Sequence, residues 1–141
     1  PYPERVTALA NTYIYKDQRT CADSMEIAMD YPKEGFMARY GTYFGSSDGN
    51  FFRFFGEDAT LNATRWSWDD PFIIEKDNGR STSPAPLGRS THHMKNFFDC
   101  IRTRETPSAD IEAGFGHAVA SLMAEKSLVE GRTVTFSELG F

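Results

Sequence analysis

The first two thirds of the chain alternate apolar and polar side chains with the two-residue period of β-strands. In residues 24–31 every second side chain, from Met25 to Tyr31, is large and apolar, so this segment predicts a strand with one buried face. Turn residues separate it from residues 36–44, and the two segments predict a hairpin. Further strands are expected at residues 6–15, 51–55 and 59–65, separated by loop residues at 46–50 and 56–58.

The last third changes to the 3.6-residue period of α-helices. An apolar stripe formed by Met94, Phe97, Phe98 and Ile101 predicts a helix over residues 91–104. A second helix is expected over residues 111–130, with Asp110 as its N-cap and Gly131 as its C-terminal cap.

Residues 132–136 predict a final strand, whereas residues 76–90 have the composition of a loop without periodicity. Strands first and helices later, with short connections between successive strands, are typical of the α+β class. We therefore expect residues 1–141 to form a single domain, with an open, mostly antiparallel β-sheet and two C-terminal helices packed on one face.

Composition and charge exclude several classes of function. The 141 residues carry 15 Lys and Arg against 20 Asp and Glu, a net charge of −5, which argues against nucleic-acid binding. No apolar run approaches the ~20 residues needed to cross a bilayer, so a membrane protein is not expected. Cys21 and Cys100 match neither a disulfide framework nor a zinc spacing, and reduced thiols in a cytoplasmic protein are the default expectation.

Two histidines and a cysteine lie within nine positions of one another near the first helix. His93 and Cys100 share one flank of that helix, but seven residues correspond to a rise of roughly 10 Å along its axis. Two ligands of one metal, or a thiol and its base, must approach within about 3 to 4 Å. The segment is therefore interpreted as a helix facing the core, with Ser90 or Thr91 as its N-cap and His92 on the opposite side.

Other chemical candidates have simpler structural interpretations. Gly114-Phe115-Gly116 lies in a helical pattern without a preceding strand, so close packing is favoured over phosphate binding. Glu75-Lys76-Asp77 is expected to be a solvated rim rather than an acid/base cluster. His117 is expected to be a packed or surface histidine, and Trp66 and Trp68 are expected to pack in a core or an interface.

The order of motifs in the last third is more specific than any of these features. Asn-Phe-Phe-Asp-Cys-Ile-Arg at 96–102 precedes Pro107, Ala-Asp-Ile-Glu at 109–112, a helix rich in small residues, and Gly-Arg before a strand. The run from His92 to Phe136 thereby resembles the end of the Gfo/Idh/MocA oxidoreductases. Residues 31–36 and 55–61 resemble that family's hairpin and a glycine-containing strand pair, although Ala59 replaces the usual second glycine.

The resemblance implies the C-terminal domain of a longer enzyme. In that family, NAD or NADP is bound by an N-terminal Rossmann domain with a glycine-rich loop. A Glu-Lys-Pro lysine and an Asp-x-x-x-His pair transfer protons, and none of these motifs occurs in this sequence. The chain alone is accordingly expected to be inactive, with no catalytic, cofactor-binding or metal residues. Its sheet is expected to form a homodimer or homotetramer through its open face.

The same resemblance implies that the domain contributes to the substrate pocket of an oxidoreductase acting on a sugar, polyol or similar hydroxylated small molecule. Its substrate contacts are expected from the loop after the hairpin and from the segment before the first helix. Polar groups at these places can donate to or accept from several hydroxyls at once. The residues concerned are Ser47, Asp48, Asn50, Arg89, His92 and His93.

Two other hypotheses remain open at this stage. The chain could be a free-standing interaction or ligand-binding module that kept the fold without a dinucleotide domain. It could also be a metal-binding module centred on His92, His93 and His117, although no ligand spacing supports this.

Overall fold

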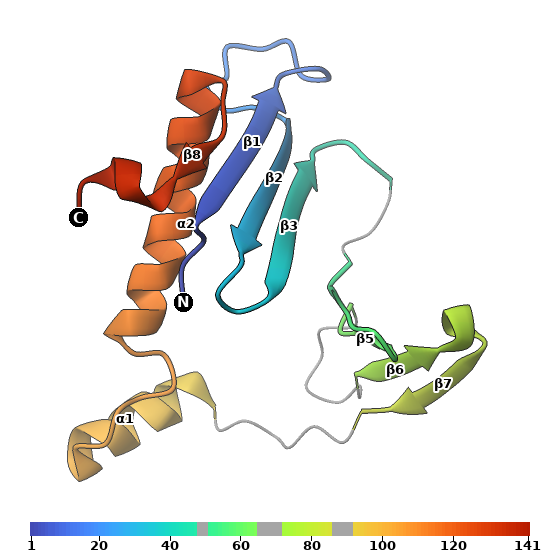
Figure 1. Cartoon of the computed structure of the whole chain (residues 1–141), viewed down its shortest axis with the longest axis vertical. Helices are drawn as coiled ribbons and strands as arrows, with labels where there is room; N and C mark the ends of the chain where they lie inside the picture. The colour runs from blue at the N-terminus through green and yellow to red at the C-terminus, as the bar shows by residue number, and fades with distance from the viewer. Residues whose placement is uncertain (48–50, 65–71, 86–91) are drawn as a thin grey trace. The chain divides into compact units, whose positions relative to one another are not determined.

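The computed structural model describes residues 1–47, 51–64, 72–85 and 92–141 (Figure 1). Two compact units make up the chain. One joins Pro1–Ser46 to His93–Phe141, and the other is Ser47–His92. Among the described residues, each unit contains one four-stranded antiparallel sheet, and the first also contains the helices α1 and α2. The α+β class with open antiparallel sheets is therefore confirmed.

The sheet of the first unit has the strand order β3-β2-β1-β8. Its strands are β1 (Arg5–Asn11), β2 (Ser24–Tyr31), β3 (Phe36–Tyr43) and the short β8 (Val134–Thr135), which is followed by the 3₁₀ helix η2 (Phe136–Leu139). The β2–β3 hairpin has the predicted position, and Gly35 takes a positive φ of 76° in its turn.

Helix α2 (Ile111–Glu130) covers one face of this sheet along β1 (Figure 1). Its bounds match the prediction because both ends carry strong local signals. The Asp110 side chain accepts a hydrogen bond from the Ala113 N–H at 2.8 Å, and Gly131 ends the helix in the left-handed region at φ 64°.

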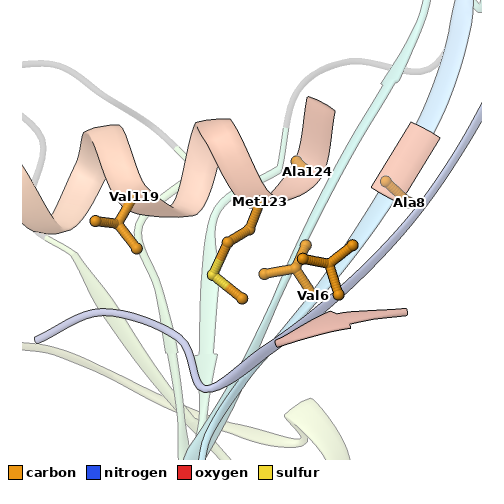
Figure 2. Packing of buried hydrophobic residues seen from close by; sticks show 6 residues of the cluster. Val6, Ala8, Val119, Met123 and Ala124 are labelled. Atoms are coloured by element: carbon orange, nitrogen blue, oxygen red, sulfur yellow. The ribbon is translucent and has the colours of Figure 1, made fainter. Parts of the chain in front are cut away.

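The core lies between α2 and β1 (Figure 2). Met123 reaches from α2 toward Val6, and both side chains are fully buried. Truncating a buried methionine to alanine typically costs about 2–5 kcal/mol. The remaining buried members of the cluster are Ala8, Val119, Ala124 and Val134.

Strand β1 ends at Asn11 rather than at the predicted Tyr15, because a buried carboxylate binds the backbone that follows. The fully buried Asp23 accepts hydrogen bonds from the N–H groups of Tyr13, Ile14 and Tyr15 at 3.0, 2.8 and 2.9 Å. Burial raises the pKa of this carboxyl, but the three N–H donors outweigh burial and hold its pKa below the usual range. These donors are consequently not available to extend a strand.

Helix α1 (His93–Thr103) is shorter than the predicted 91–104 and has no buried residue. Its predicted apolar stripe is present, but each member is about half exposed within the described chain. The helix ends near Arg104, which takes a positive φ of 63°. The proposed caps Ser90 and Thr91 lie outside the described residues.

The second unit contains β4 (Arg53–Phe55), β5 (Thr60–Asn62), β6 (Ile73–Lys76) and β7 (Ser81–Pro84), in that spatial order. The prediction of a loop over residues 76–90 is therefore wrong for residues 76–84. Lys76 ends β6, the 3₁₀ turn η1 (Asp77–Gly79) reverses the chain, and β7 pairs back onto β6. The sequence of β7 lacks any apolar alternation, so its pairing could not be read from periodicity.

Candidate functional site

Three of the six residues expected to contact substrate are described by the structure, and all three are exposed. Ser47 and His92 are the first and last residues of the second unit, and His93 is the first residue of α1. Asp48, Asn50 and Arg89 lie outside the described residues, as do Trp66 and Trp68.

His93 and Cys100 of α1 do not form a reactive pair. His93 lies at the first position of the helix, whereas Cys100 is two turns further on and half-buried. The Cys100 Sγ atom is 3.8 Å from Nδ2 of Asn96, whose Oδ1 accepts hydrogen bonds from the backbone N–H and hydroxyl of Ser108. Among the described residues, no group of three His, Cys, Asp or Glu side chains could hold a metal ion.

The glycine pair of α2 does not form a phosphate-binding loop. Gly114 donates its N–H to the Asp110 carbonyl within the helix, at 3.1 Å. A Cβ atom on Gly116 would lie 2.2 Å from the carbonyl oxygen of Pro1, so this glycine permits a close backbone approach. Close packing, as predicted from the sequence, explains Gly116, and the exposed His117 is the expected surface histidine.

A charged network occupies the face of the first sheet that α2 does not cover. The Arg39 guanidinium donates to the Glu26 carboxylate with Nε 2.8 Å from Oε2, and the Tyr43 hydroxyl donates to Oε1. Gly41 lies directly opposite Glu26, and a Cβ there would be 2.8 Å from Oε1, so the glycine leaves room for the carboxylate.

These contacts fix the charge states of the network. The Arg39 guanidinium, followed by the Tyr43 hydroxyl, lowers the pKa of Glu26 to about 2. The Glu26 carboxylate in turn raises the pKa of the Tyr43 hydroxyl, which is therefore not available as a general base near neutral pH. The network consequently forms a paired, charged surface rather than an acid/base pair.

The rest of this face combines one more ion pair with exposed apolar side chains. Arg5 and Asp30 are directly opposite each other, and the Arg5 Nε donates to the Asp30 carboxylate at 3.0 Å. Leu9 and Met37 are each 73% exposed on the same face. A depression of about 410 Å³ lies here, with Thr7 and Met37 among its lining residues. The charges of this face are thus paired within it, and exposed apolar side chains lie beside them.

The sheet of the second unit has two chemically different faces. On one face Phe54, Leu61 and Ile74 lie directly opposite one another on successive strands. The Phe54 ring also contacts the Phe52 ring, with centroids 4.8 Å apart. The other face is mixed, and the register of the same strands places Phe55, Ile73 and Pro84 on it beside the polar residues Arg53, Thr60, Asn62, Glu75 and Thr82.

Three polar side chains meet on this second face. The Asn62 Nδ2 donates to Oε1 of Glu75 at 2.7 Å, and Nη2 of Arg53 lies 4.0 Å from the same oxygen. Asn62 is itself positioned by the Thr64 N–H, which donates to its Oδ1 at 3.0 Å. The Glu75 side chain is only 21% exposed, so the prediction that it belongs to a solvated rim is wrong, whereas Lys76 and Asp77 are exposed as expected.

Sequence reasoning did not find this cluster, because Arg53, Asn62 and Glu75 come from three strands and meet only through the register of the sheet. A signal was present in the alternation of these strands, which places polar residues of all three strands on the same face. No helix in the described part of the chain is long and apolar enough to span a membrane.

Comparison with known proteins identifies the fold. No protein-family model and no curated protein sequence matches this chain. Solved structures do match: an oxidoreductase from Agrobacterium radiobacter, determined with NAD+, L-tartaric acid and magnesium, superposes with a TM-score of 0.69 at 15% identity. The alignment covers 98% of this chain and 44% of that protein.

Two further matches are of the same kind. A protein of Desulfitobacterium hafniense, provisionally classified as an NADPH-dependent oxidoreductase, gives a TM-score of 0.71 at 18% identity, over 97% of this chain and 43% of its own. A probable dehydrogenase from Thermotoga maritima gives a TM-score of 0.67 at 17% identity, and the alignment covers 96% of this chain and 44% of that protein. The fold is thus one found in oxidoreductases, and the chain spans less than half the length of these proteins.

Proposed function

We propose that this chain is the substrate-side and oligomerisation domain of an NAD(P)-dependent oxidoreductase of the Gfo/Idh/MocA type. The observation that carries the proposal is the likeness of nearly the whole chain to less than half of several oxidoreductases and dehydrogenases. The motif order between His92 and Phe136, found from the sequence alone, supports the same family.

In this proposal the dinucleotide is bound by a domain outside the 141 residues. The residues described here do not fit a dinucleotide site, because the Gly114-Phe115-Gly116 segment lies inside α2. The negatively charged Asp110 side chain also occupies the N-terminal end of that helix, where a phosphate would otherwise be favoured. The chain alone is therefore proposed to be inactive. We also propose a cytoplasmic location for the protein.

The proposed substrate is a sugar, polyol or similar hydroxylated small molecule. Ser47, Asp48, Asn50, Arg89, His92 and His93 are proposed to contact it. The exposure of Ser47, His92 and His93 is compatible with this role. Hydroxyl, carboxylate, amide and imidazole groups together offer both donors and acceptors, as a ligand with several hydroxyls requires.

The proposed oligomer, a homodimer or homotetramer, forms through the uncovered face of the first sheet. Supporting features are the Glu26–Arg39 and Arg5–Asp30 pairs, which cancel charge on that face, and the exposed Leu9. Buried charges are tolerated at an interface only when they are paired in this way.

The test is a steady-state assay on the full-length protein that contains this chain, with NAD+ and NADP+ and a panel of sugars and polyols. We expect one nicotinamide cofactor to be reduced, and His93→Ala to lower kcat/KM at least tenfold, about 1.4 kcal/mol. His117→Ala removes an exposed histidine of α2 and serves as the matched control. No turnover with any substrate would contradict the proposed function. Equal kcat/KM in the two variants would contradict the placement of His93 at the substrate.

A further inference from the structure

The two edge strands of the second sheet differ in their side chains. Strand β7 is polar over Ser81–Ser83 and ends with Pro84, and polar residues and proline protect an exposed edge from pairing with another strand. Strand β4 instead carries Phe54 and Phe55, which are 52% and 77% exposed. In the part of the chain that the structure describes, no strand pairs with the outer edge of β4. This edge is therefore open to a further strand.

The backbone groups on the outer edge of β4 follow from its pairing with β5. The Ala63 N–H donates to the Phe52 carbonyl at 2.8 Å, in the register that β4 and β5 share. Along an antiparallel ladder, residues that bond to the neighbouring strand alternate with residues that do not. Phe54 therefore bonds to β5, whereas Arg53 and Phe55 direct their N–H and C=O groups to the free edge.

We propose that β4 pairs antiparallel with β4 of a second copy of this chain, which joins two four-stranded sheets into one. Phe54 then lies opposite its own copy on a twofold axis, and Arg53 lies opposite Phe55 of the partner subunit. Both residues of this second pair direct their backbone groups outward, so each of the two symmetric pairs exchanges both N–H···O=C hydrogen bonds.

The side chains of this register are self-complementary on one face. The two copies of Phe54 form a pair without backbone hydrogen bonds, where Cβ atoms approach to about 4.5–5.5 Å and aromatic side chains stabilise a sheet. Phe54, Leu61 and Ile74 lie opposite one another on successive strands. The pairing extends this apolar row across the contact and covers part of the exposed Phe54 ring.

The other face is complementary in charge. Each Arg53 guanidinium lies beside the ring of Phe55 of the partner subunit, where a cation–π interaction is favourable. Nη2 of Arg53 is also 4.0 Å from Oε1 of Glu75 in its own sheet, so the contact gathers no unpaired charge. A second copy fits this edge because the cation and the ring lie two residues apart on the same strand, and antiparallel pairing brings each opposite the other.

This contact goes beyond the proposed function and does not rest on it, since it lies on the second sheet and requires no catalysis. Few residues take part. Interfaces below about 1,200 Å² are typical of weak association, so we expect a dissociation constant in roughly the micromolar range.

The experiment is sedimentation velocity of the full-length protein that contains this chain, at low and high micromolar concentrations. Phe55→Pro removes an N–H that faces away from β5, so the sheet is retained while the contact loses hydrogen bonds and a ring. We expect this variant to have half the mass of the assembly that the unchanged protein forms at high concentration.

Thr82→Pro is the matched control on the opposite edge. The Ala85 N–H donates to the Phe72 carbonyl at 2.7 Å, and the same alternation directs the Thr82 N–H away from β6. This variant is expected to assemble as the unchanged protein does. Equal masses for all three proteins, or a halved mass in both variants, would refute pairing through β4. A mass that grows without limit with concentration would indicate open-ended aggregation and would also contradict the twofold pairing.

Amide hydrogen exchange in the unchanged protein, followed by NMR, gives a readout that depends on no variant. The Arg53 and Phe55 N–H groups should be protected at high protein concentration and should exchange on dilution, whereas the Thr82 N–H should exchange rapidly at both concentrations. Protection of Arg53 and Phe55 that is independent of concentration would show that this edge is covered within one chain, which would overturn the proposal. Rapid exchange at every concentration would overturn it as well.

Discussion

Replacing Ser127 by alanine tests how the first sheet is joined to its helix. Strand β8 pairs only with Arg5 and Val6, so the next residues of β1 have no partner in β8. At this point the fully buried Ser127 accepts a hydrogen bond from the Ala8 N–H at 2.9 Å and donates to the Arg132 carbonyl at 2.6 Å. One hydroxyl therefore links β1, α2 and the turn that leads to β8.

The size of the expected effect follows from what alanine leaves behind. Removing the hydroxyl leaves the buried Ala8 N–H without its acceptor, which costs about 1–3 kcal/mol. Alanine recovers a few tenths of a kcal/mol, roughly 0.5, through its better helix propensity. The net loss in the free energy of unfolding should be about 0.5–2.5 kcal/mol, which lowers Tm by roughly 2–10 °C for a chain of this size.

The assay is urea denaturation followed by far-UV circular dichroism, combined with amide hydrogen exchange at Ala8. Ser121→Ala is the matched control, because Ser121 lies on the same helix, is exposed, and donates its hydroxyl to the His117 carbonyl within that helix. We expect the control to stay within about 0.5 kcal/mol of the unchanged protein. Equal stability in the two alanine variants, with Ala8 still protected from exchange, would refute this account of the junction.

Three further predictions concern glycines and charge. Gly116→Ala should destabilise the protein by about 1–3 kcal/mol, because its Cβ would meet the backbone of Pro1. Gly114→Ala has open space around it and should stabilise the helix by up to about 1 kcal/mol, and thermal unfolding of the two variants checks both values. Gly41→Ala should displace the Glu26 carboxylate and raise its pKa from about 2 toward 4.5, as read by carboxyl NMR titration, with an unchanged titration counting against the packing described. Because the pKa of Glu26 is lowered on folding, its stabilising contribution is present above about pH 4.5 and is lost as the pH falls toward 2. In Glu26→Gln the free energy of unfolding, measured by urea denaturation, should depend less on pH across that window. An identical pH dependence in the variant and the unchanged protein would be inconsistent with this linkage.

Local signals in the sequence were enough to predict some elements closely. Helix α2 begins and ends where Asp110 and Gly131 were expected to cap it, because a cap acts within one turn of the chain. Strand β2 has its predicted bounds, because its alternation reflects one face packed toward the core and one face open. The predicted hairpin with β3 followed from the intervening turn.

Elements that depend on distant residues could not be predicted in this way. The early end of β1 depends on the Asp23 carboxylate, which lies after the strand in sequence. Strand β7 is polar and exists through its pairing with β6. The Arg53 and Glu75 cluster requires the register of three strands, so no local pattern marks it. Conversely, the six residues first expected to contact substrate came from a family resemblance, and they stay a prediction.

The measurement that tests the central claim most directly is the intact mass of the protein as its native source makes it, together with the sequence that precedes Pro1. The account predicts a species more than twice as heavy as this chain, since the chain covers 43–47% of the similar oxidoreductases. The preceding sequence should contain a glycine-rich strand–turn–helix and a lysine with an Asp-x-x-x-His pair. A native mass equal to that of the 141 residues would contradict the oxidoreductase account.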